Sequence, residues 1–158
     1  MRKTLRKKLI QRGQSLTEFA LALTLMMTLL AGAVDMGSAF FSYIAIRDAA
    51  QEGALYGSIA AVVDANGNGR YDTGEALNTA AVVNRVRQSS TQPVDLTDAS
   101  NVTVSVSVTN PPCAGGGITV TVSYNYQLTM PLVGAIIGSQ TIPISASVTN
   151  TILKPSCP

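Results

Sequence analysis

The stretch that decides the fold is residues 19–34, which read FALALTLMMTLLAGAV and include no charged side chain. As a helix this stretch would span about 24 Å, slightly less than the roughly 30 Å hydrocarbon core of a membrane. Residues 14–18 and 36–46 add length on either side, with Glu18 as the only charged residue among them. The pattern therefore predicts a membrane-spanning helix near the amino terminus.

A basic segment precedes this apolar run. Residues 1–13 hold six of the eleven Lys and Arg residues and no acidic residue. Because positively charged flanks stay in the cytoplasm, we expect the amino end inside and the following domain translocated across the cytoplasmic membrane. An ordinary secretory signal peptide, cleaved near Ala31-Gly32-Ala33, is the alternative interpretation of the same pattern.

The helical pattern continues past the apolar run. Apolar residues recur at near-helical spacing from Met36 to Val62, with charged residues such as Arg47 and Asp48 between them. No proline occurs before residue 93. We therefore expect one long helix over residues 14–61, with 14–35 in the membrane or filament core, followed by an extracytoplasmic domain over 62–158.

Three segments of this helix resemble a known family when taken as an ordered set. They are GQSLTEFAL at 13–21, VDMGSAFF at 34–41 and DAAQEGA at 48–54. Together they resemble the TadE-like pseudopilins of the tight-adherence (Tad) branch of the type IV pilus superfamily. The resemblance implies a pilin-like α+β fold and a structural, non-enzymatic subunit of a surface filament used in cell adhesion.

The resemblance also implies how the chain is processed. A membrane prepilin peptidase would cleave between Gly13 and Gln14, where a glycine lets a protease approach the backbone closely. Glu18 would then be the fifth mature residue, followed by Phe19, and would pair with the amino terminus of a neighbouring subunit during assembly. In the alternative interpretation, Ser15 and Glu18 form a capping box for the helix.

Residues 64–75 read DANGNGRYDTGE and match a calcium-binding loop of the EF-hand type. Oxygen donors fall at the required positions, and a glycine occupies the sixth position, where the loop must turn sharply. The predicted ligands are Asp64, Asn66, Asn68, the Arg70 carbonyl, Asp72 and Glu75. We expect a structural calcium ion here, followed by a second helix over residues 75–88. The alternative is a solvated turn built on the Asn-Gly pairs.

The carboxyl half alternates apolar and polar residues over 102–108, 118–128 and 142–148. Such period-two alternation predicts antiparallel strands with one buried face and one wet face rich in Ser and Thr. The two predicted helices would cover the buried face. Residues 91–100 are interpreted as a linker, and 130–138 as an apolar core segment or subunit contact that is too short to span a membrane.

Cys113 and Cys157 are the only two cysteines. An even cysteine count in an exported domain favours a disulfide, which would join the loop at 110–117 to the carboxyl-terminal tail. Two free thiols are the alternative. A disulfide would also agree with the predicted translocation of the domain.

Composition excludes several functional classes. The chain has no His, so the commonest general base and zinc ligand are missing. Its net charge is +2, but the basic residues concentrate in residues 1–13, so the folded part is mildly acidic and unsuited to nucleic acid. The leading function is a filament subunit that associates with like subunits and the inner membrane. The second is a membrane-anchored, calcium-stabilised surface domain that never polymerises, and a secreted enzyme is a distant third.

Overall fold

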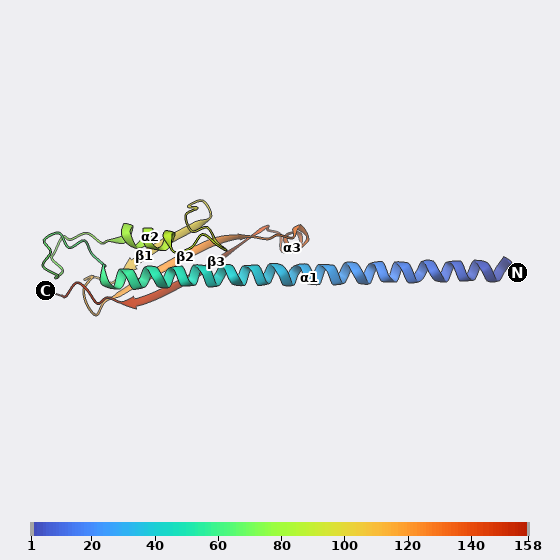
Figure 1. Cartoon of the computed structure of the whole chain (residues 1–158), viewed down its shortest axis with the longest axis horizontal. Helices are drawn as coiled ribbons and strands as arrows, with labels where there is room; N and C mark the ends of the chain where they lie inside the picture. The colour runs from blue at the N-terminus through green and yellow to red at the C-terminus, as the bar shows by residue number, and fades with distance from the viewer. Residues whose placement is uncertain (1, 158) are drawn as a thin grey trace. The chain divides into compact units, whose positions relative to one another are not determined.

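The computed structural model describes the backbone of residues 2–157, and the side chains of residues 14–157 other than those at 131, 132 and 136. The side chains of the predicted leader, residues 1–13, lie outside the described residues. Figure 1 shows one long helix, two short helices and one sheet. In chain order these are α1 (Arg2–Ile59), α2 (Thr79–Gln88), β1 (Val102–Val108), β2 (Gly117–Gln127), α3 (Pro131–Ile137) and β3 (Thr141–Thr151).

The chain divides into two compact units, and α1 contributes to both. The helical unit comprises Met1–Ser38 and Leu128–Gln140, so it contains the first part of α1 together with α3. The sheet unit comprises Ala39–Gln127 and Thr141–Pro158 and contains the rest of α1, α2 and the sheet. Each unit is described by itself below.

The sheet unit is built around one hydrophobic core. In Figure 1, α2 and the three strands lie alongside the carboxyl half of α1. Apart from Ile46, small residues line the buried face of α1, whereas branched aliphatic residues come from α2 and the strands. The main members are Ile46, Ala49, Ala50, Ala54, Val82, Val86, Val102, Ile118, Val120, Val122, Ala146 and Ile152. The predicted α+β architecture, with a long helix packed on a small antiparallel sheet, is confirmed.

Two glycines let α1 approach its neighbours closely. A Cβ atom at Gly53 would overlap the Val86 side chain of α2 and lie 3.3 Å from the Val120 side chain of β2. At Gly57 it would overlap Ile118 and lie 3.3 Å from Val82. Because the core is already close-packed, any larger residue at these positions must displace its neighbours.

The sheet has the order β1-β2-β3, and both pairings are antiparallel. Val104 faces Val122 across the first pair, and Val120 faces Val148 across the second. Every second residue of β2 from Ile118 to Val122 is buried. On the other face, the hydroxyls of Thr119 and Thr149 lie 2.7 Å apart. The alternation of apolar and polar residues therefore predicted both faces of the sheet correctly.

The second helix begins later than predicted, at Thr79 rather than near residue 75. The preceding residues pair with the chain that follows α1: the Val63 amide donates to the Ala76 carbonyl at 2.9 Å, and Leu77 bridges to Val62. This pairing closes the neck of the 64–75 loop. Residues 76 and 77 must be extended to make this pairing, so the helix can begin only after them.

The prediction of a simple linker over residues 91–100 is wrong in one respect. The segment has no helix or strand, but Val94 and Leu96 are fully buried in the core. The Arg87 guanidinium of α2 donates to the Leu96 carbonyl at 3.0 Å. Residues 91–100 therefore pack on the core through Val94 and Leu96 and are more than a spacer.

The helical unit pairs the first part of α1 with a short hairpin-like segment, Leu128–Gln140, that contains α3. The Leu128 amide donates to the Gln140 carbonyl at 2.9 Å and closes the base of this segment. Helix α3 ends at Ile137 and is followed by Gly138, whose φ of 80° is left-handed. The apolar residues 130–138, predicted as a core segment or subunit contact, therefore form a helix with a glycine stop.

Candidate functional site: the amino-terminal helix and the polar loop

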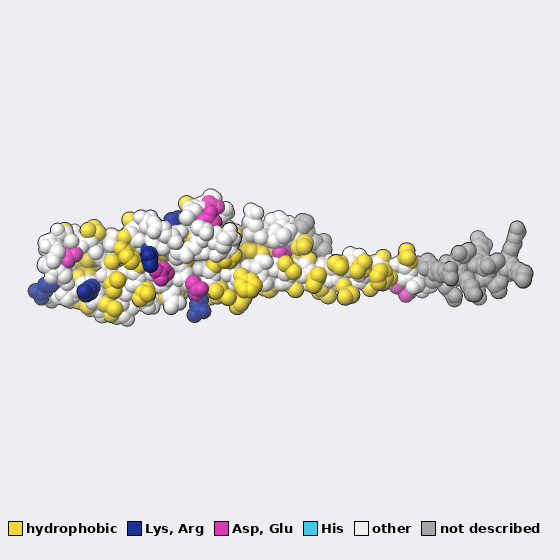
Figure 2. All heavy atoms as spheres, viewed as in Figure 1, with side chains coloured by type: hydrophobic (Ala, Val, Ile, Leu, Met, Phe, Trp, Pro, Cys, Tyr) yellow, Lys and Arg dark blue, Asp and Glu magenta, His cyan; other side chains and the backbone are white. Residues whose placement is uncertain are grey.

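The first part of α1 exposes large apolar side chains on all sides. Leu21 and Met36 are each 74% exposed within the chain. Others of this kind are Leu16, Phe19, Leu25, Met26, Met27, Leu29, Leu30 and Val34. Figure 2 shows hydrophobic side chains gathered along this part of the helix. A helix that is apolar all round requires lipid or other protein as its surroundings.

Among the described residues, one helix is long and apolar enough to cross a membrane by length and composition, at Gln14–Ile59. Its most apolar window has a mean hydropathy of 1.9, and only 6% of that window is buried inside the chain. This part of α1 is therefore not covered as the core helix of a soluble domain would be.

Glu18 and Phe19, the predicted assembly residues, lie exposed on α1. The Gln14 side-chain amide donates to Glu18 Oε1 at 3.1 Å, one helical turn away. Because α1 starts at Arg2, the backbone at Ser15 is already inside a helix. In the uncleaved chain, Ser15 and Glu18 therefore do not lie at a helix start, where a capping box would satisfy unpaired backbone N–H groups.

Asp35 is the buried acid of the helical unit. It lies directly after the apolar run and is only 4% exposed. Its carboxylate accepts the Thr129 amide on Oδ1 at 3.2 Å and the Met130 amide on Oδ2 at 3.1 Å. A charged group thus binds two backbone donors immediately before α3, and such charge-assisted bonds are among the stronger ones in proteins.

In the 64–75 loop, Asp64 organises the backbone. Its Oδ1 accepts the Gly67 amide at 2.6 Å and the Asn68 amide at 3.2 Å, and its Oδ2 accepts the Gly69 amide at 2.8 Å. Gly67 and Gly69 have φ values of 70° and 71°, which favour glycine. The first loop residue and the glycine at the sixth position thus form the turn that the spacing predicts.

Asp72 is the hydrogen-bonding centre of the same loop. The side-chain amides of Asn66 and Asn68 donate to its Oδ2 at 2.7 Å and 2.8 Å. These two bonds, Asn66 first and then Asn68, lower the pKa of Asp72 below its usual range. The carboxylate is therefore ionised at neutral pH.

Glu75 closes the loop from its last position. Its Oε1 accepts the Ala65 amide at 3.2 Å, and its Oε2 accepts the Asp72 amide at 3.1 Å. The donor set is entirely oxygen, which fits a hard cation such as calcium. Among the side chains that the structure describes, however, no group of three His, Cys, Asp or Glu is gathered closely enough to hold a metal ion.

The carboxyl-terminal tail, residues 152–157, fastens the loop to the rest of the sheet unit. The Tyr71 amide donates to the Ser156 carbonyl at 2.9 Å, and the Ser156 amide donates to the Gly69 carbonyl at 3.1 Å. Next to Ser156, Cys157 forms the predicted disulfide with Cys113, with Cα atoms 5.0 Å apart. The tail also reaches the end of α1, where the Leu153 amide donates to the Ser58 carbonyl at 2.7 Å.

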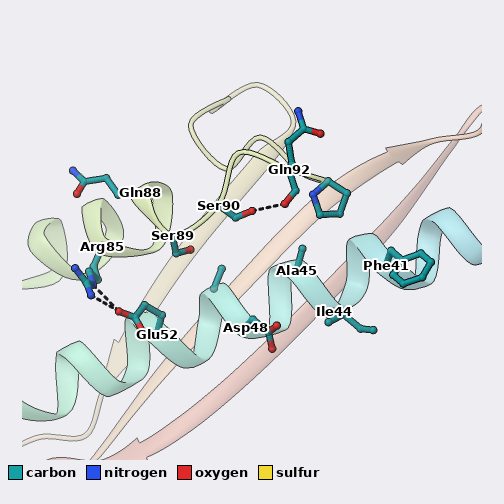
Figure 3. Close-up of a pocket in the computed structure, with 12 residues that line it drawn as sticks. Phe41, Ile44, Ala45, Asp48, Glu52, Arg85, Gln88, Ser89, Ser90 and Gln92 are labelled. Carbon is teal, nitrogen blue, oxygen red and sulfur yellow. Dashed lines mark hydrogen bonds and ion pairs between the residues drawn. The ribbon is translucent and has the colours of Figure 1, made fainter.

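A groove of about 630 Å³ lies between α1, α2 and the residues after α2, as Figure 3 shows. Arg85 of α2 donates to the Glu52 carboxylate of α1 through Nε at 2.8 Å. The Ser89 and Ser90 hydroxyls donate to the carbonyls of Val86 and Gln92. Both hydroxyls therefore make local backbone bonds, and neither is set against a carboxylate as an activated nucleophile.

Sequence reasoning missed the two acids that tie the helix to other segments. Asp35 had a local signal, since it is the only charged residue in the segment 19–46. Its partners, however, are 94 and 95 positions away. For the ion pair between Glu52 and Arg85, the sequence offered only their opposite charges, which did not predict that the two residues would meet.

The comparison with family models agrees with the geometry of α1. Residues 13–55 match the family described as TadE-like protein. The match begins at the glycine of the predicted processing site and ends within the part of α1 that packs on the sheet. The searches among curated proteins and among solved structures gave no significant match. The resemblance seen in the sequence is thus confirmed: over residues 13–55 the chain is similar to the TadE-like family.

Proposed function

We propose that this chain is a structural pilin-like subunit of a tight-adherence, type IV-like surface filament. The observation that supports this most directly is the TadE-like match over residues 13–55, on a helix whose large apolar side chains are exposed. Such a helix needs lipid before assembly and like or related subunits afterwards. A structural role also agrees with the absence of His from the sequence.

Processing by a prepilin peptidase between Gly13 and Gln14 is part of this proposal. Removal of residues 1–13 would create a charged α-amino group on Gln14, close to the Glu18 carboxylate. In the uncleaved chain Glu18 already accepts the Gln14 side-chain amide. A lone carboxylate at the membrane edge is costly unless it finds a partner, and the amino terminus of a neighbouring subunit would supply one.

Processing and assembly can be tested together by intact mass measurement on protein recovered from sheared surface filaments. The proposal expects a mature chain that begins at Gln14. A chain that retains Met1, or one that begins near Val34, would contradict it. A disulfide removes two hydrogen atoms from the mass of the chain. The same spectrum therefore shows whether Cys113 and Cys157 are paired in the exported protein.

The role of Glu18 can be tested separately with Glu18→Ala. Cleavage and membrane insertion should continue, whereas incorporation into filaments should fall. Thr17→Ala is the matched control, because Thr17 is an exposed neighbour whose hydroxyl donates only to the Gln14 carbonyl at 2.7 Å. Equal filament yields from both variants would show that the carboxylate does not direct assembly.

A non-polymerising, membrane-anchored surface domain is the second candidate, and the compact disulfide-linked sheet unit favours it. This alternative expects the chain in the membrane fraction and none of it in sheared filaments. The intact mass distinguishes the two functions, since an ordinary anchored domain has no reason to be cleaved after Gly13.

We also propose that the 64–75 loop binds one structural calcium ion. The candidate ligands are Asp64, Asn66, Asn68, the Arg70 carbonyl, Asp72 and Glu75. The lowered pKa of Asp72 supports the proposal because calcium binds the ionised carboxylate. The carbonyl of Gly69 and the amide of Tyr71 both face Ser156.

Calcium binding would draw the carboxylates of Asp64, Asp72 and Glu75 together and would stabilise the sheet unit. If binding occurs only to the folded state, calcium at 100 times Kd adds about 2.7 kcal/mol to the free energy of unfolding. Chelation should therefore lower the melting temperature of the full chain in detergent. Magnesium should replace calcium poorly, because its octahedral shell suits a bidentate carboxylate less well.

Two Glu→Gln variants make the calcium test specific. Glu75→Gln should abolish the heat of calcium binding and the effect of the chelator. Glu52→Gln makes the same chemical change at an exposed ion pair outside the loop and should leave both intact. If the wild-type chain gives no heat with calcium and melts unchanged in chelator, the loop is a polar turn.

A further inference from the structure

We propose that the Leu128–Gln140 segment, held by Asp35, inserts into the outer leaflet of the cytoplasmic membrane beside α1. This inference rests on the membrane insertion of α1 in the proposed function. It adds a second lipid-contacting element to the chain. The partner is the phospholipid bilayer itself, met by the subunit before any assembly.

The position of this segment along α1 places it at membrane depth. Asp35 lies about 24 Å along the helix from Phe19, which is within the roughly 30 Å thickness of a hydrocarbon core. An apolar groove of about 400 Å³ lies between the two elements, lined by α1 residues from Thr24 to Val34 and by Met130 and Val133. If this part of α1 is in the bilayer, the segment packed against it is in the bilayer too.

The composition of the segment suits lipid. Residues 128–140 read LTMPLVGAIIGSQ and include no charged side chain. Uncharged apolar stretches of roughly 10–14 residues are typical of core helices or of re-entrant and interfacial segments. Among its described side chains, Ile137 is 56% exposed and Met130 is 37% exposed, which is more than a covered core segment would show.

The polar groups near the groove are already bonded, which lowers the cost of placing them in hydrocarbon. The Thr24 and Thr28 hydroxyls donate to the carbonyls of Ala20 and Thr24 at 2.8 Å and 2.9 Å. At the far end of α3, the Gly138 amide donates to the Gly134 carbonyl at 2.8 Å.

Asp35 has a definite role in this arrangement. It is the only charged residue between Phe19 and Ile46, and an ionisable group inside a membrane is costly unless partnered. The amides of Thr129 and Met130 are the donors that precede α3, and Pro131, which follows them, has none. The acid and the two amides therefore satisfy one another, and each would be costly in lipid without the other.

The chain contains no Trp, so single tryptophans can report depth by fluorescence. The full chain would be placed at low density in phospholipid vesicles whose acyl chains are brominated near the headgroup end. Ile137→Trp should then be quenched and its emission shifted to the blue. Leu153→Trp is the matched control, since Leu153 is an apolar residue of the sheet unit with a similar exposure of 62%. It should not be quenched.

A third variant, Leu25→Trp, separates this inference from the proposed function. Quenching at Leu25→Trp without quenching at Ile137→Trp would overturn the inference and leave the membrane span intact. Absence of quenching at both positions would overturn both. A blue-shifted but unquenched Ile137→Trp would show that protein, such as a second copy of the chain, covers the segment, and would also overturn the inference.

The role of Asp35 is tested in the Ile137→Trp background. Asp35→Ala should reduce the quenching to the level of Leu153→Trp, because the hydrogen bonds from the Thr129 and Met130 amides to α1 are lost. Asp48→Ala removes an exposed acid from the same helix and should leave the quenching unchanged. Undiminished quenching in Asp35→Ala would show that the carboxylate does not hold the segment in the membrane.

Discussion

The two parts of α1 differ in the size and exposure of their apolar residues. In the helical unit the helix exposes Leu, Met and Phe side chains, and a Cβ atom added at Gly32 or Gly37 would meet no neighbour within 4 Å. In the sheet unit the same helix buries Ala49, Ala50 and Ala54, and its glycines contact α2 and β2. One continuous helix thus has one part suited to lipid or other subunits and one suited to its own sheet.

On the side of α1 that packs on the sheet, residue size matters more than hydrophobicity, because large apolar residues of the same unit, such as Phe41 and Leu55, are exposed rather than buried. Small residues let the helix backbone come close to a sheet whose own valines and isoleucines fill the core. Large residues on every face leave no preferred side for intramolecular packing. Changes in the sheet unit should therefore alter folding stability, whereas changes on the exposed part should alter membrane contact or assembly.

The largest effect on stability is expected from the Cys113→Ser/Cys157→Ser double variant. The disulfide spans a sequence separation of 44 residues, for which the chain-entropy model gives a loss of about 4 kcal/mol. Thermal unfolding of the full chain in detergent, followed by near-ultraviolet circular dichroism of the tyrosines, measures the loss.

Two controls accompany the disulfide variant. A reducing agent should lower the melting temperature of the wild type and leave that of the double variant unchanged. Because the tail that contains Cys157 also bonds to Gly69 and Tyr71, the variant should bind calcium more weakly if the loop is a calcium site. Equal melting of oxidised and reduced wild type would contradict the stabilising role.

The next largest effect is expected from Gly53→Ala, which tests the close approach of α1 directly. The added methyl group would overlap Val86, a buried and stiff β-branched side chain of α2. Overpacking of this kind costs about 1–3 kcal/mol. Gly37→Ala is the matched control in the helical unit; it meets no neighbour and should be neutral or up to about 1 kcal/mol stabilising. Equal melting of the two variants would remove the distinction between the two parts of the helix.

Local periodicity predicted most of this architecture, because it reports which face of an element is buried. For the strands, a period of two identified the buried face correctly. For α1, the spacing predicted a helix but not its buried face, because Phe40, Leu55 and Ile59 are exposed whereas Ala49, Ala50 and Ala54 are buried. The delayed start of α2 was not predictable in this way, since it depends on Val62 and Val63 pairing with Leu77 and Ala76 across the loop. The Asn and Gly residues of the loop, in contrast, predicted its turns because their effect on the backbone is local.

Long-range contacts account for what the sequence did not predict about the candidate site. The burial of Val94 and Leu96 depends on the position of α2 above the core, which no local pattern reports. In the same way, the two backbone amides that donate to the Asp35 carboxylate reach it because residues 129 and 130 return to α1. The charge of an isolated acid can be read from sequence, but its partner requires the fold.

A smaller effect is expected from the turn before β1, where Asp98 holds polar groups at the surface of the sheet unit. The Ser100 hydroxyl donates to Oδ1 at 2.5 Å, and the Asn101 side-chain amide donates to Oδ2 at 2.7 Å. These bonds, Ser100 first, lower the pKa of Asp98 to about 2. A depressed pKa stabilises the fold above the usual Asp pKa of about 3.9, and this stabilisation is lost as pH falls from there toward 2.

Acid unfolding curves of wild type and Asp98→Asn check this contribution. The wild type should lose stability more steeply between about pH 4 and 2, because it has a carboxylate at position 98 that takes up a proton in that range, whereas Asp98→Asn has none there. Ser100→Ala should show a reduced slope, since it removes the bond that contributes most to the shift. Parallel curves for all three proteins would show that the turn adds no pH dependence.

The smallest effect on folding stability is expected from Leu25→Ala, on the exposed part of α1. Leu25 is 62% exposed and belongs to the helical unit, so its truncation should change the free energy of unfolding of the sheet unit by no more than about 0.5 kcal/mol. The loss should instead appear in the yield of filaments, because lipid and neighbouring subunits are the surroundings that the side chain would meet. Near-ultraviolet melting and filament yield, measured on the same preparation, separate the two effects. A fall in melting temperature as large as that of Gly53→Ala, with an unchanged filament yield, would show that Leu25 serves the fold of its own chain and that residue size does not separate the two parts of the helix.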